Sequence, residues 1–586
     1  MCGIFGYIGN KNNAAEIVFE GLKLLEYRGY DSWGVAVKNG KSVDVQKRVG
    51  KIGQANVKLN NSNIGIGHTR WATHGGVTIE NAHPHLDCRK QIAVIHNGIV
   101  ENYEKLKMEL IKKEHKFLSE TDTEVIAHLI EEYLKKQGFA SSVRDAFNEL
   151  KGLNAIVVMN SKSREIVAAK TGSPLVLGKN GDDIFIASDV SGILKHTNNV
   201  MFLKDKEMVI LGNGIKLLSL PDGKQLKPQF ETVNWKYEDA MKGEYDHFML
   251  KEIYEQPKVI RNIAKEYDNQ IITLVKFINT AQGTFFIGAG TAFNACLGGT
   301  YIFSKIAREH VNTTVASEFN YLEDFLNKDS LIIALSQSGE TIDVIEPLNR
   351  AKKKGSKIIA ITNVLGSTIY RMSDYKLLLG AGPEKAVAST KAYVAKLSIL
   401  LLIAFAKAGK FNDGKKLILE AAEEIERILN KENIELIKRI AKVIDSSENL
   451  YIIGRGLSYA SSLEAALKIK EVSYLHAEGL AGGELKHGPI ALISKGTPCI
   501  VFAPFDETYD AIISNSMEIK SRGGLIIGIS PENNDVFDYW IKVKDTKEAT
   551  IISEIVPAQL LGYFIAINKG HDPDRPRNLA KSVTVK

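Results

Sequence analysis

The sequence has few cysteines, little net charge and no long hydrophobic run, and each absence excludes a class of protein. The 586 residues include only four cysteines and no CxxC pair, which excludes a small disulfide-stabilised fold and a zinc ribbon. The net charge is +6, from 75 basic and 69 acidic residues, and this is too small for a nucleic-acid or membrane surface. The longest apolar run, 397–406, is interrupted by Ser398 and is shorter than the ~18 residues of a membrane span.

The composition is that of ordinary soluble globular protein, with 44 % apolar and 25 % charged residues. No basic and then apolar leader is visible at the start, so we expect a cytoplasmic protein that contacts neither nucleic acid nor membrane. At roughly 150 residues per domain, the length alone predicts about four domains.

Short β-rich runs alternate with glycine-rich turns in the first third of the chain. Strands are predicted at 4–8, 34–37, 64–69 and 92–96. Apolar residues at helical spacing predict a helix over 14–25, and Thr121-Asp122-Thr123-Glu124 is a capping-box pattern that opens a second helix. We expect an α+β domain over 2–212, followed by a polar linker over 213–246.

The rest of the chain contains an internal repeat. The segment 285–290 (FFIGAG) matches 451–456 (YIIGRG), and the apolar strands 331–335 and 358–361 are echoed by 499–503 and 526–529. Apolar strands separated by helical patterns are typical of parallel α/β sheets. We therefore predict two copies of one doubly wound domain, at 275–414 and 441–576, with a tail at 577–586. The repeat lowers the expected number of domains from four to three.

Each copy carries a Gly-x-Gly turn, but the third glycine of a dinucleotide-binding loop is missing. Phe293 and Tyr459 stand in its place, so nicotinamide binding is not expected. The pair His83-x-His85 resembles part of a metal site, yet no cluster of cysteines or acids near it in the sequence completes a ligand set. The sequence therefore predicts neither a cofactor nor a metal.

Cys2 becomes the first residue once Met1 is removed, and its α-amine then lies within reach of its thiol. An α-amine has a pKa near ~7.7, which suits a general base that takes the thiol proton and returns it to a leaving amine. The plain alternative is that Cys2 is a second residue without chemistry.

Other groups downstream suit acyl transfer from an amino-acid amide. The Asn97 side chain and the Gly98 backbone N–H, at a predicted strand end, suit a developing oxyanion. Arg70 offers a clamp for a carboxylate, and Asp122 offers an anion for an ammonium group. Taken singly, Arg70 equally suits a surface ion pair, and Asp122 an acid in the first turn of a helix.

Five segments carry a resemblance: EYRGYDS (26–32), HTRWATHG (68–75), NAHPH (81–85), HNG (96–98) and TDTE (121–124). In this order they resemble the class II glutamine amidotransferases, which are N-terminal-nucleophile (Ntn) hydrolases with an αββα sandwich. Specifically, they resemble the glutamine–fructose-6-phosphate aminotransferase family. The resemblance implies a glutamine site made of Arg70, Trp71, Thr73, His74, His83 and Asp122, with Trp71 as the gate of an ammonia route. Trp33 departs from the small residue that the family has beside this site.

Ser336-Gln337-Ser338-Gly339-Glu340-Thr341 lies between a predicted strand and a predicted helix. Hydroxyls and free backbone N–H groups at the positive end of a helix suit a phosphate, although a plain N-cap has the same composition. The second copy has Phe502-Ala503-Pro504-Phe505 at this place, and proline has no N–H to donate. We therefore expect only the first copy to bind phosphate with this loop.

Groups from the second copy and from the chain end complete the candidate residues. Glu464, Lys468 and Glu471 share one predicted helical face, as they also would in a solvated ion-pair ladder. The segments SQSGET, VASTKA, ALKIKEVSY, GGELKHGP and PRNLAKSVTV resemble the two sugar-isomerase (SIS) domains of the same family. A carboxylate base and a lysine imine together suffice to move a proton between the carbons of a ketose.

The resemblance gives these groups roles. It implies that Lys581 forms a Schiff base, that Glu471 moves the proton, that Lys468 assists, and that His487 opens the sugar ring from the neighbouring subunit of a dimer. The sugar phosphate is held by Thr291, Ser336, Gln337, Ser338, Thr341, Val387, Ser389 and Ala580. Ala292 replaces the serine that is usual in the family after the first Gly-Thr, so one hydrogen bond to the sugar phosphate is not expected here.

The resulting hypothesis is an enzyme that uses L-glutamine and fructose 6-phosphate to make glucosamine 6-phosphate, with ammonia passing internally between two sites of a homodimer. One alternative is a phosphoribosyl-diphosphate amidotransferase, whose acidic-pair and Gly-Thr-Thr motif we do not find. A second alternative is a sugar-phosphate sensor, which would not need Cys2, Glu471, His487 and Lys581 together.

Overall fold

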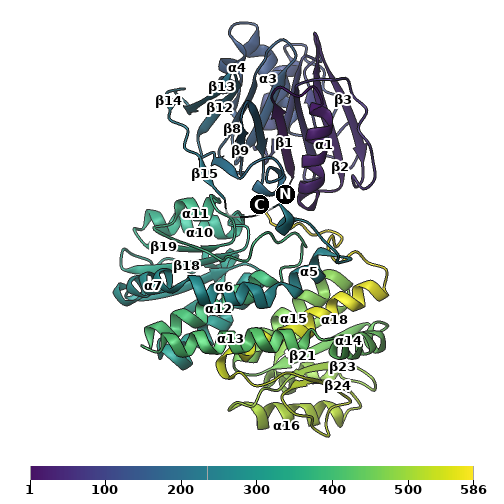
Figure 1. Cartoon of the computed structure of the whole chain (residues 1–586), viewed down its shortest axis with the longest axis vertical. Coiled ribbons are helices and arrows are strands. Elements are labelled where there is room, and N and C mark those ends of the chain that lie inside the picture. The colour runs from purple at the N-terminus through teal and green to yellow at the C-terminus, as the bar shows by residue number, and fades with distance from the viewer. Residues whose placement is uncertain (1, 234, 236, 585–586) are drawn as a thin grey trace. The chain divides into compact units, whose positions relative to one another are not determined.

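The computed structural model describes residues 2–233, 235 and 237–584, which fall into two units (Figure 1). The first unit contains the chain up to Met241 together with the residues from Ala580 on, and the second unit is Lys242–Leu579. The last residues of the predicted tail, 585 and 586, and two positions of the predicted linker, 234 and 236, lie outside the described residues.

Two antiparallel sheets stack face to face in the first unit. The eight-stranded sheet has the order β15-β11-β9-β10-β1-β4-β2-β3, and the seven-stranded sheet has the order β14-β13-β12-β8-β7-β6-β5. The strands are β1 (Gly3–Ile8), β2 (Ser32–Asn39), β3 (Ser42–Val49), β4 (Ile64–Arg70), β5 (His85–Leu86), β6 (Ile92–Asn97), β7 (Ala155–Asn160), β8 (Ile166–Lys170), β9 (Val176–Asn180), β10 (Asp183–Ala187), β11 (Asn199–Phe202), β12 (Glu207–Gly212), β13 (Gly214–Ser219), β14 (Gln225–Leu226) and β15 (Glu231–Thr232). Their inner faces share one apolar core.

Helices cover both outer faces of this pair of sheets. Helix α1 (Ala14–Leu25) packs on β1, β2 and β4. Helices α2 (Tyr103–Ile111), α3 (Glu124–Leu134) and α4 (Phe139–Glu149) close a second apolar core against the seven-stranded sheet. The predicted αββα sandwich is thus confirmed, and the expected strands and helices correspond to β1, β2, β4, β6, α1 and α3.

The structure differs from the sequence prediction at two places in this unit. The segment 213–246, expected to be a polar linker, contributes β13, β14 and β15 to the sheets, because Leu217 enters the core between them. Helix α3 begins after Thr123 without a side-chain cap. The Glu124 carboxylate instead accepts hydrogen bonds from the N–H groups of Leu118 and Ser119, so the capping box is not formed.

The second unit contains two parallel five-stranded sheets, with the orders β17-β16-β18-β19-β20 and β22-β21-β23-β24-β25. The strands are β16 (Gly283–Gly288), β17 (Asn312–Val315), β18 (Ser330–Ser336), β19 (Lys357–Thr362), β20 (Tyr375–Leu378), β21 (Asn449–Gly454), β22 (His476–Ala481), β23 (Pro498–Phe502), β24 (Leu525–Ser530) and β25 (Tyr539–Lys542). Both sheets follow one topology, so the internal repeat read from the sequence is a structural repeat. Its detail extends to the turn after the first strand, where Gly290 has φ 54° and Gly456 has φ 56°.

Helices surround both sheets. They are α5 (Phe248–Tyr254), α6 (Gln256–Glu266), α7 (Asp268–Thr280), α8 (Thr291–Ile302), α9 (Ala316–Phe319), α10 (Ile342–Lys353), α11 (Thr368–Met372), α12 (Lys391–Lys407), α13 (Phe411–Ile428), α14 (Lys431–Ile444), α15 (Leu457–Ser473), α16 (Tyr509–Lys520), α17 (Thr550–Ser553) and α18 (Ile555–Asn568). Most of them share one large apolar core, whereas α9, α10 and α11 pack in a second core on the first sheet and α16 in a third core on the second sheet. By length and composition, 547–568 is apolar enough to cross a membrane, but 94 % of its apolar window is buried inside the unit. It is a core segment of this fold.

Candidate active sites

Cys2 lies directly before β1, next to the end of β4, where Arg70 and Trp71 follow. The Trp71 backbone N–H donates a hydrogen bond to Cys2 Sγ at 3.2 Å, and Sγ lies 3.5 Å from the Trp71 carbonyl oxygen. The Cys2 carbonyl oxygen accepts hydrogen bonds from Asn97 Nδ2 at 3.0 Å and from Arg28 Nε at 3.1 Å. The antiparallel pairing of β1 with β4 therefore brings Cys2 next to Trp71, and Asn97 reaches them from the end of β6 in the other sheet.

Asn97 is oriented by a buried histidine that the sequence prediction did not include. His68 Nε2 lies 3.1 Å from Asn97 Oδ1 and 3.0 Å from the His96 carbonyl oxygen. Both partners are acceptors, so Nε2 carries the proton. Burial lowers the pKa of His68 to about 3, and the ring is neutral at pH 7. This bond fixes the Asn97 amide with its Nδ2 toward Cys2.

Gly98 follows β6 in a conformation that only glycine adopts easily. Its φ is +131°, and a Cβ built on it would lie 2.2 Å from the Leu153 carbonyl oxygen. The chain can therefore turn here, directly after Asn97, only because position 98 has no side chain.

A chain of neutral hydrogen bonds continues from the predicted residue His83. His96 Nε2 donates to Asn154 Oδ1 at 2.9 Å, so His96 Nδ1 accepts from Thr123 Oγ1 at 2.8 Å. The Thr123 oxygen in turn accepts from His83 Nε2 at 3.0 Å. Burial lowers the pKa of His83 and of His96, in keeping with neutral rings. His83 is thus a buried member of a network in the wall of the site, and its contact with glutamine stays a prediction.

Arg70 and Asp122 lie near the same cysteine. The Arg70 guanidinium donates to the carbonyl oxygens of Gly76 at 3.0 Å and Gly75 at 3.2 Å, and also to that of His74. Burial lowers the pKa of Arg70, and the neighbouring side chains of Cys2, Asp31 and Asp122 act in the opposite direction. Asp122 Oδ2 accepts the Val100 N–H at 2.7 Å. The site therefore pairs one cation with one anion beside a thiol.

Two residues expected at this site are less enclosed. Thr73 is exposed, and His74 is half-buried with its ring 5.7 Å from that of Tyr103. Trp33, the departure from the family pattern, is buried on the α1 side of the eight-stranded sheet, where its ring lies 5.1 Å from Phe19. Trp33 therefore serves the packing of α1.

The second candidate site centres on Lys468 in helix α15. Its Nζ is fully buried and donates to Thr291 Oγ1 at 2.9 Å and to Glu471 Oε2 at 2.5 Å. Thr291 Oγ1 in turn donates to Glu464 Oε1 at 3.0 Å. Thr291 opens α8 of the first copy, while the charged residues lie on α15 of the second, so the repeat itself builds this cluster. In this structure the Thr291 hydroxyl links Lys468 to Glu464 through its two hydrogen bonds.

The charges of this cluster are unevenly solvated. Burial raises the pKa of Glu464 to about 7, although Lys468 and the amide of Asn294 act against burial. Burial lowers the pKa of Lys468, but the carboxylates of Glu471 and Glu464 outweigh it and raise that pKa above its ordinary value. Glu471 keeps one-fifth of its side chain exposed. The result is a fixed ammonium group beside a carboxylate that still reaches solvent.

The serine-rich loop lies between β18 and α10, as the sequence predicted. Ser336 Oγ accepts the Gly339 N–H at 2.9 Å, and Ser338 Oγ accepts the Glu340 N–H at 3.2 Å. Gly339 has φ +66°, and Thr341 is the residue before α10. Two hydroxyls and the start of a helix thus meet in one turn, which suits a phosphate.

The remaining residues predicted for the sugar phosphate are scattered over other loops. Ser389 Oγ donates to Glu384 Oε2 at 3.0 Å, and the Val387 N–H donates to the Asp574 carbonyl oxygen at 3.1 Å. Gln337 is half-buried in the serine-rich loop itself. The contact of Gln337, Val387 and Ser389 with a sugar phosphate stays a prediction. Ala292, the departure from the family pattern, is buried in α8.

Three predicted residues are not gathered at the Lys468 cluster by the described structure of the second unit. His487 ends a short 3₁₀ turn and is exposed. Ala580 and Lys581 group with the first unit. Their roles stay predictions.

Comparisons with known proteins identify the parts of the chain. The family model of the glutamine amidotransferase domain matches residues 68–195. The family model of the SIS domain matches twice, at 277–406 and at 443–549. The chain therefore combines one glutamine amidotransferase domain with two SIS domains.

Full-length relatives identify the family to which the chain belongs. A glutamine–fructose-6-phosphate aminotransferase (isomerizing) of Thermococcus kodakarensis is 42 % identical and one of Clostridium tetani is 43 % identical, each over 100 % of both chains. The C-terminal domain of glucosamine-fructose-6-phosphate aminotransferase from Francisella tularensis matches with a TM-score of 0.52 and 33 % identity, covering 57 % of this chain and 99 % of that one. The chain belongs to the glutamine–fructose-6-phosphate aminotransferase family.

Proposed function

We propose that this chain transfers the amide nitrogen of L-glutamine to fructose 6-phosphate and so forms glucosamine 6-phosphate. The observation that carries the proposal is the grouping of Cys2, Asn97 and Arg70 around one thiol in a chain whose full-length relatives carry that name. The Lys468–Glu471 pair supplies the second half of the chemistry.

In the glutaminase half, Cys2 Sγ attacks the side-chain amide carbon of glutamine. The α-amine of Cys2, once it is the mature terminus, takes the thiol proton and delivers it to the leaving ammonia. Asn97 Nδ2, held 3.0 Å from the Cys2 carbonyl oxygen, and the Gly98 N–H receive the oxyanion. Arg70 and Asp122 bind the α-carboxylate and α-ammonium groups of glutamine. Water then hydrolyses the thioester to glutamate.

In the isomerase half, Lys581 condenses with the ketose carbonyl and water leaves. Ammonia then displaces Lys581 from the imine carbon, and Glu471 transfers a proton from C1 to C2 of the sugar, which leaves the amine on C2. Lys468, at 2.5 Å from Glu471 Oε2, holds that carboxylate in place. The Ser336–Thr341 loop holds the phosphate, and His487 of a neighbouring subunit opens the ring. The homodimer, the internal passage of ammonia past Trp71, and a cytoplasmic location belong to the same proposal.

Two variants with opposite losses test it. Cys2→Ala is expected to abolish glutamate release and to leave the interconversion of fructose 6-phosphate and glucose 6-phosphate measurable. Glu471→Gln is expected to abolish that interconversion and to leave glutamate release measurable. Loss of both activities in either variant would contradict two separate sites. If the wild-type protein binds sugar phosphate but releases no glutamate from glutamine, it is a sensor and the proposal is wrong.

Mass spectrometry of the mature protein shows whether Met1 is removed. A retained Met1 would overturn the role of the α-amine.

A further inference from the structure

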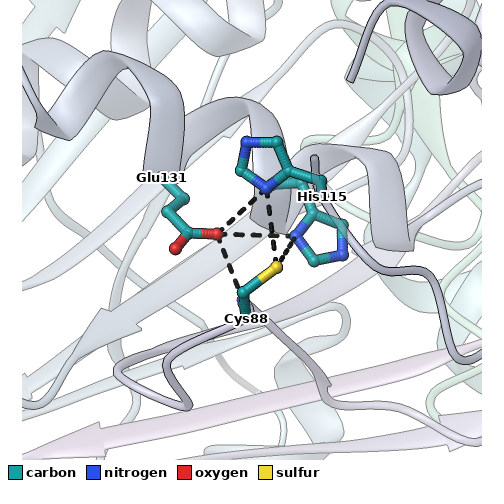
Figure 2. Close-up of side chains that lie close together, drawn as sticks. Cys88, His115 and Glu131 are labelled. Carbon is teal, nitrogen blue, oxygen red and sulfur yellow. Dashed lines mark hydrogen bonds and ion pairs between the residues drawn. The ribbon is translucent and has the colours of Figure 1, made fainter. Parts of the chain in front are cut away.

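Four side chains far apart in the sequence converge in the first unit, away from the residues of the mechanism above. They are Cys88, His115, His128 and Glu131, and one potential ligand atom from each lies within 4.8 Å of all the others. Figure 2 shows Cys88, His115 and Glu131 pointing toward one another. We propose that these four residues bind one divalent zinc ion, and that the ion braces the wall of the amidotransferase site.

The local fold explains why these residues meet. Cys88 lies in the turn between β5 and β6, where Asp87 Oδ1 accepts the N–H groups of Gln91 and Ile92 and so closes the hairpin. His115 lies in the connection between α2 and α3. His128 and Glu131 are three residues apart on α3, so both face the same side of this helix. Three separate backbone segments are thus tied at one point.

The distances are those between the ligands of one tetrahedral ion. Cys88 Sγ lies 3.6 Å from His115 Nδ1 and 3.6 Å from His128 Nδ1. Glu131 Oε2 lies 3.2 Å from His115 Nδ1 and 3.6 Å from His128 Nδ1. For the usual zinc–sulfur, zinc–nitrogen and zinc–oxygen bond lengths, tetrahedral ligand atoms lie about 3.6 Å apart for sulfur and nitrogen, and about 3.3 Å apart for nitrogen and oxygen. Four of the six distances between the ligand atoms thus match those of a zinc tetrahedron, and the other two are at most 4.8 Å.

The surroundings of the two imidazoles support the same conclusion. Each ring turns Nδ1 to the cluster and Nε2 to a carboxylate: His115 Nε2 lies 2.8 Å from Glu132 Oε1, and His128 Nε2 lies 3.6 Å from Glu124 Oε1. Histidine ligands of metals ordinarily donate their second ring N–H to such a carboxylate, which fixes the tautomer and raises the basicity of the ligating nitrogen. His115 has such a partner in Glu132, whereas His128 Nε2 lies beyond hydrogen-bond distance of Glu124 and is a buried nitrogen without a hydrogen bond among the described residues.

Charge and donor type select the ion. A thiolate and a carboxylate carry two negative charges, which a divalent cation neutralises, while both imidazoles bind as neutral ligands. His115, His128 and Glu131 are at most 8 % exposed, so an uncompensated charge would be costly here. Thiolate and imidazole ligands favour zinc over magnesium or calcium. Because four protein ligands fill the tetrahedron, the site is structural and has no open position for a substrate.

The brace reaches the amidotransferase site through α3. The same helix carries the ligands His128 and Glu131, and it begins directly after Thr123, the neighbour of Asp122 in the predicted glutamine site. The Glu124 carboxylate, near His128, also accepts the N–H groups of Leu118 and Ser119. An ion at this point therefore couples the start of α3 to the β5–β6 hairpin.

The competing explanation is a metal-free cluster held by hydrogen bonds and ion pairs. Burial lowers the pKa of His128, but the neighbouring carboxylates of Glu124 and Glu131 outweigh burial and raise it. A protonated His128 between carboxylates also keeps the cluster together. Metal content separates the two explanations.

The first test measures zinc in the full-length protein after equilibration with zinc and gel filtration. We expect about one zinc per chain in the wild type, and a loss of at least tenfold in affinity in Cys88→Ser and in His128→Asn. His310→Asn, which alters an exposed histidine of the second unit, is the matched control and is expected to keep the zinc. Zinc content equal in the wild type and both ligand variants would overturn the proposal.

A second measurement does not depend on variants that fold. Cobalt added to the metal-free wild type is expected to give the intense d–d bands of a tetrahedral site together with a thiolate-to-cobalt charge-transfer band, both removed by excess zinc. In a Cys2→Ala background, zinc is expected to protect one thiol, that of the exposed Cys88, from alkylation. An octahedral cobalt spectrum, or no protection of Cys88, would contradict the assigned ligands. Neither result depends on the proposed activity.

Discussion

His68 and Asn97 form a hydrogen bond that decides which end of the Asn97 amide faces Cys2. His68 Nε2 lies 3.1 Å from Asn97 Oδ1, and Asn97 Nδ2 lies 3.0 Å from the Cys2 carbonyl oxygen. Because His68 is fully buried and its pKa is lowered to about 3, the His68 ring stays neutral near pH 7 and keeps donating to Asn97 Oδ1. The Asn97 amide is therefore already oriented, and little reorganisation is needed when an oxyanion forms.

The first prediction follows from this bond. Asn97→Ala is expected to lower kcat for glutamate release by about 10²–10³-fold, the usual loss for one oxyanion donor. His68→Leu acts only through the orientation of Asn97, so we expect a smaller fall in kcat, about tenfold, with little change in KM. His68→Gln restores an N–H and is expected to recover part of the loss. Steady-state kinetics with glutamine decide the matter, and equal rates for His68→Leu and His68→Gln would contradict the positioning role.

The second prediction concerns the buried Lys468–Glu464 pair. Lys468→Met leaves the Glu464 carboxylate buried without its cation, and breaking a buried pair in this way costs about 3–5 kcal/mol. Burial raises the pKa of Glu464 to about 7 and Lys468 acts to lower it, so the variant protonates Glu464 more readily. We therefore expect the loss of thermal stability to be smaller at pH 6 than at pH 8. Adding Glu464→Gln is expected to restore most of the stability.

An exposed ion pair provides the matched control for that experiment. Lys438 contacts Glu435 at 2.8 Å on the surface of α14, with both side chains about half exposed. Lys438→Met removes the same charge and is expected to leave the unfolding midpoint nearly unchanged. If the midpoint falls equally in Lys438→Met and Lys468→Met, the effect is one of net charge, and the buried pair is not its cause.

Much of the fold could be predicted from the sequence, because its signals are local or repeated. The apolar strands of the second part are buried on both faces, and their repetition at a constant offset revealed the two sheets. The segment 213–246 was harder, because β14 and β15 are two-residue strands with exposed or half-exposed side chains. Such short strands form by pairing with strands that are distant in sequence, so the local sequence pattern does not predict them.

The residues of the candidate sites also differ in whether the local sequence or only the folded structure reveals them. Cys2, Arg70 and Asn97 lie in motifs that the sequence displays directly. The role of His68 depends on a cross-strand neighbour, and the convergence of Cys88 with His115 depends on two separate loops. The only local signal for the latter was the His128-x-x-Glu131 spacing on one helix face. The pair His83-x-His85 resembles a metal motif in the sequence, but both rings form hydrogen bonds with threonine hydroxyls.

The third prediction concerns Gly339 in the serine-rich loop. Its φ is +66°, and a Cβ would lie 2.0 Å from Ser367 Oγ, so Gly339→Ala must displace the loop. We expect KM for fructose 6-phosphate to rise at least about tenfold, which corresponds to about 1.4 kcal/mol of binding, while glutamate release measured without sugar is unchanged. Gly355→Ala is the control, since Gly355 also has a positive φ, +85°, but the nearest atom to its Cβ lies at 3.6 Å. Equal effects of both variants would show that strain alone is responsible.

The fourth prediction is a pH dependence that arises from Glu554. This buried carboxyl accepts hydrogen bonds from Ser458 Oγ at 3.0 Å and from Ser461 Oγ at 2.6 Å, and burial raises its pKa to about 7. A carboxyl whose pKa is higher in the folded than in the unfolded protein contributes its full stability below the unfolded value, near 4.5, and loses it as the pH rises through about 7.

Between about pH 4.5 and pH 7 the free energy of unfolding of the second unit is therefore expected to fall by up to about 1.4 kcal/mol per pH unit from this group alone, and this contribution levels off above about pH 7. Glu554→Gln keeps the shape and cannot ionise, so it is expected to flatten the dependence between about pH 5 and pH 7. Because Glu464 also has a raised pKa, part of the slope remains in the single variant, and the double variant Glu464→Gln, Glu554→Gln is expected to remove most of it. Hydrogen exchange in α15, which carries Ser458 and Ser461, follows the effect within this unit. An unchanged slope in Glu554→Gln would mean that this carboxyl is already ionised in the folded protein over this pH range, and that the two serines stabilise its charged form.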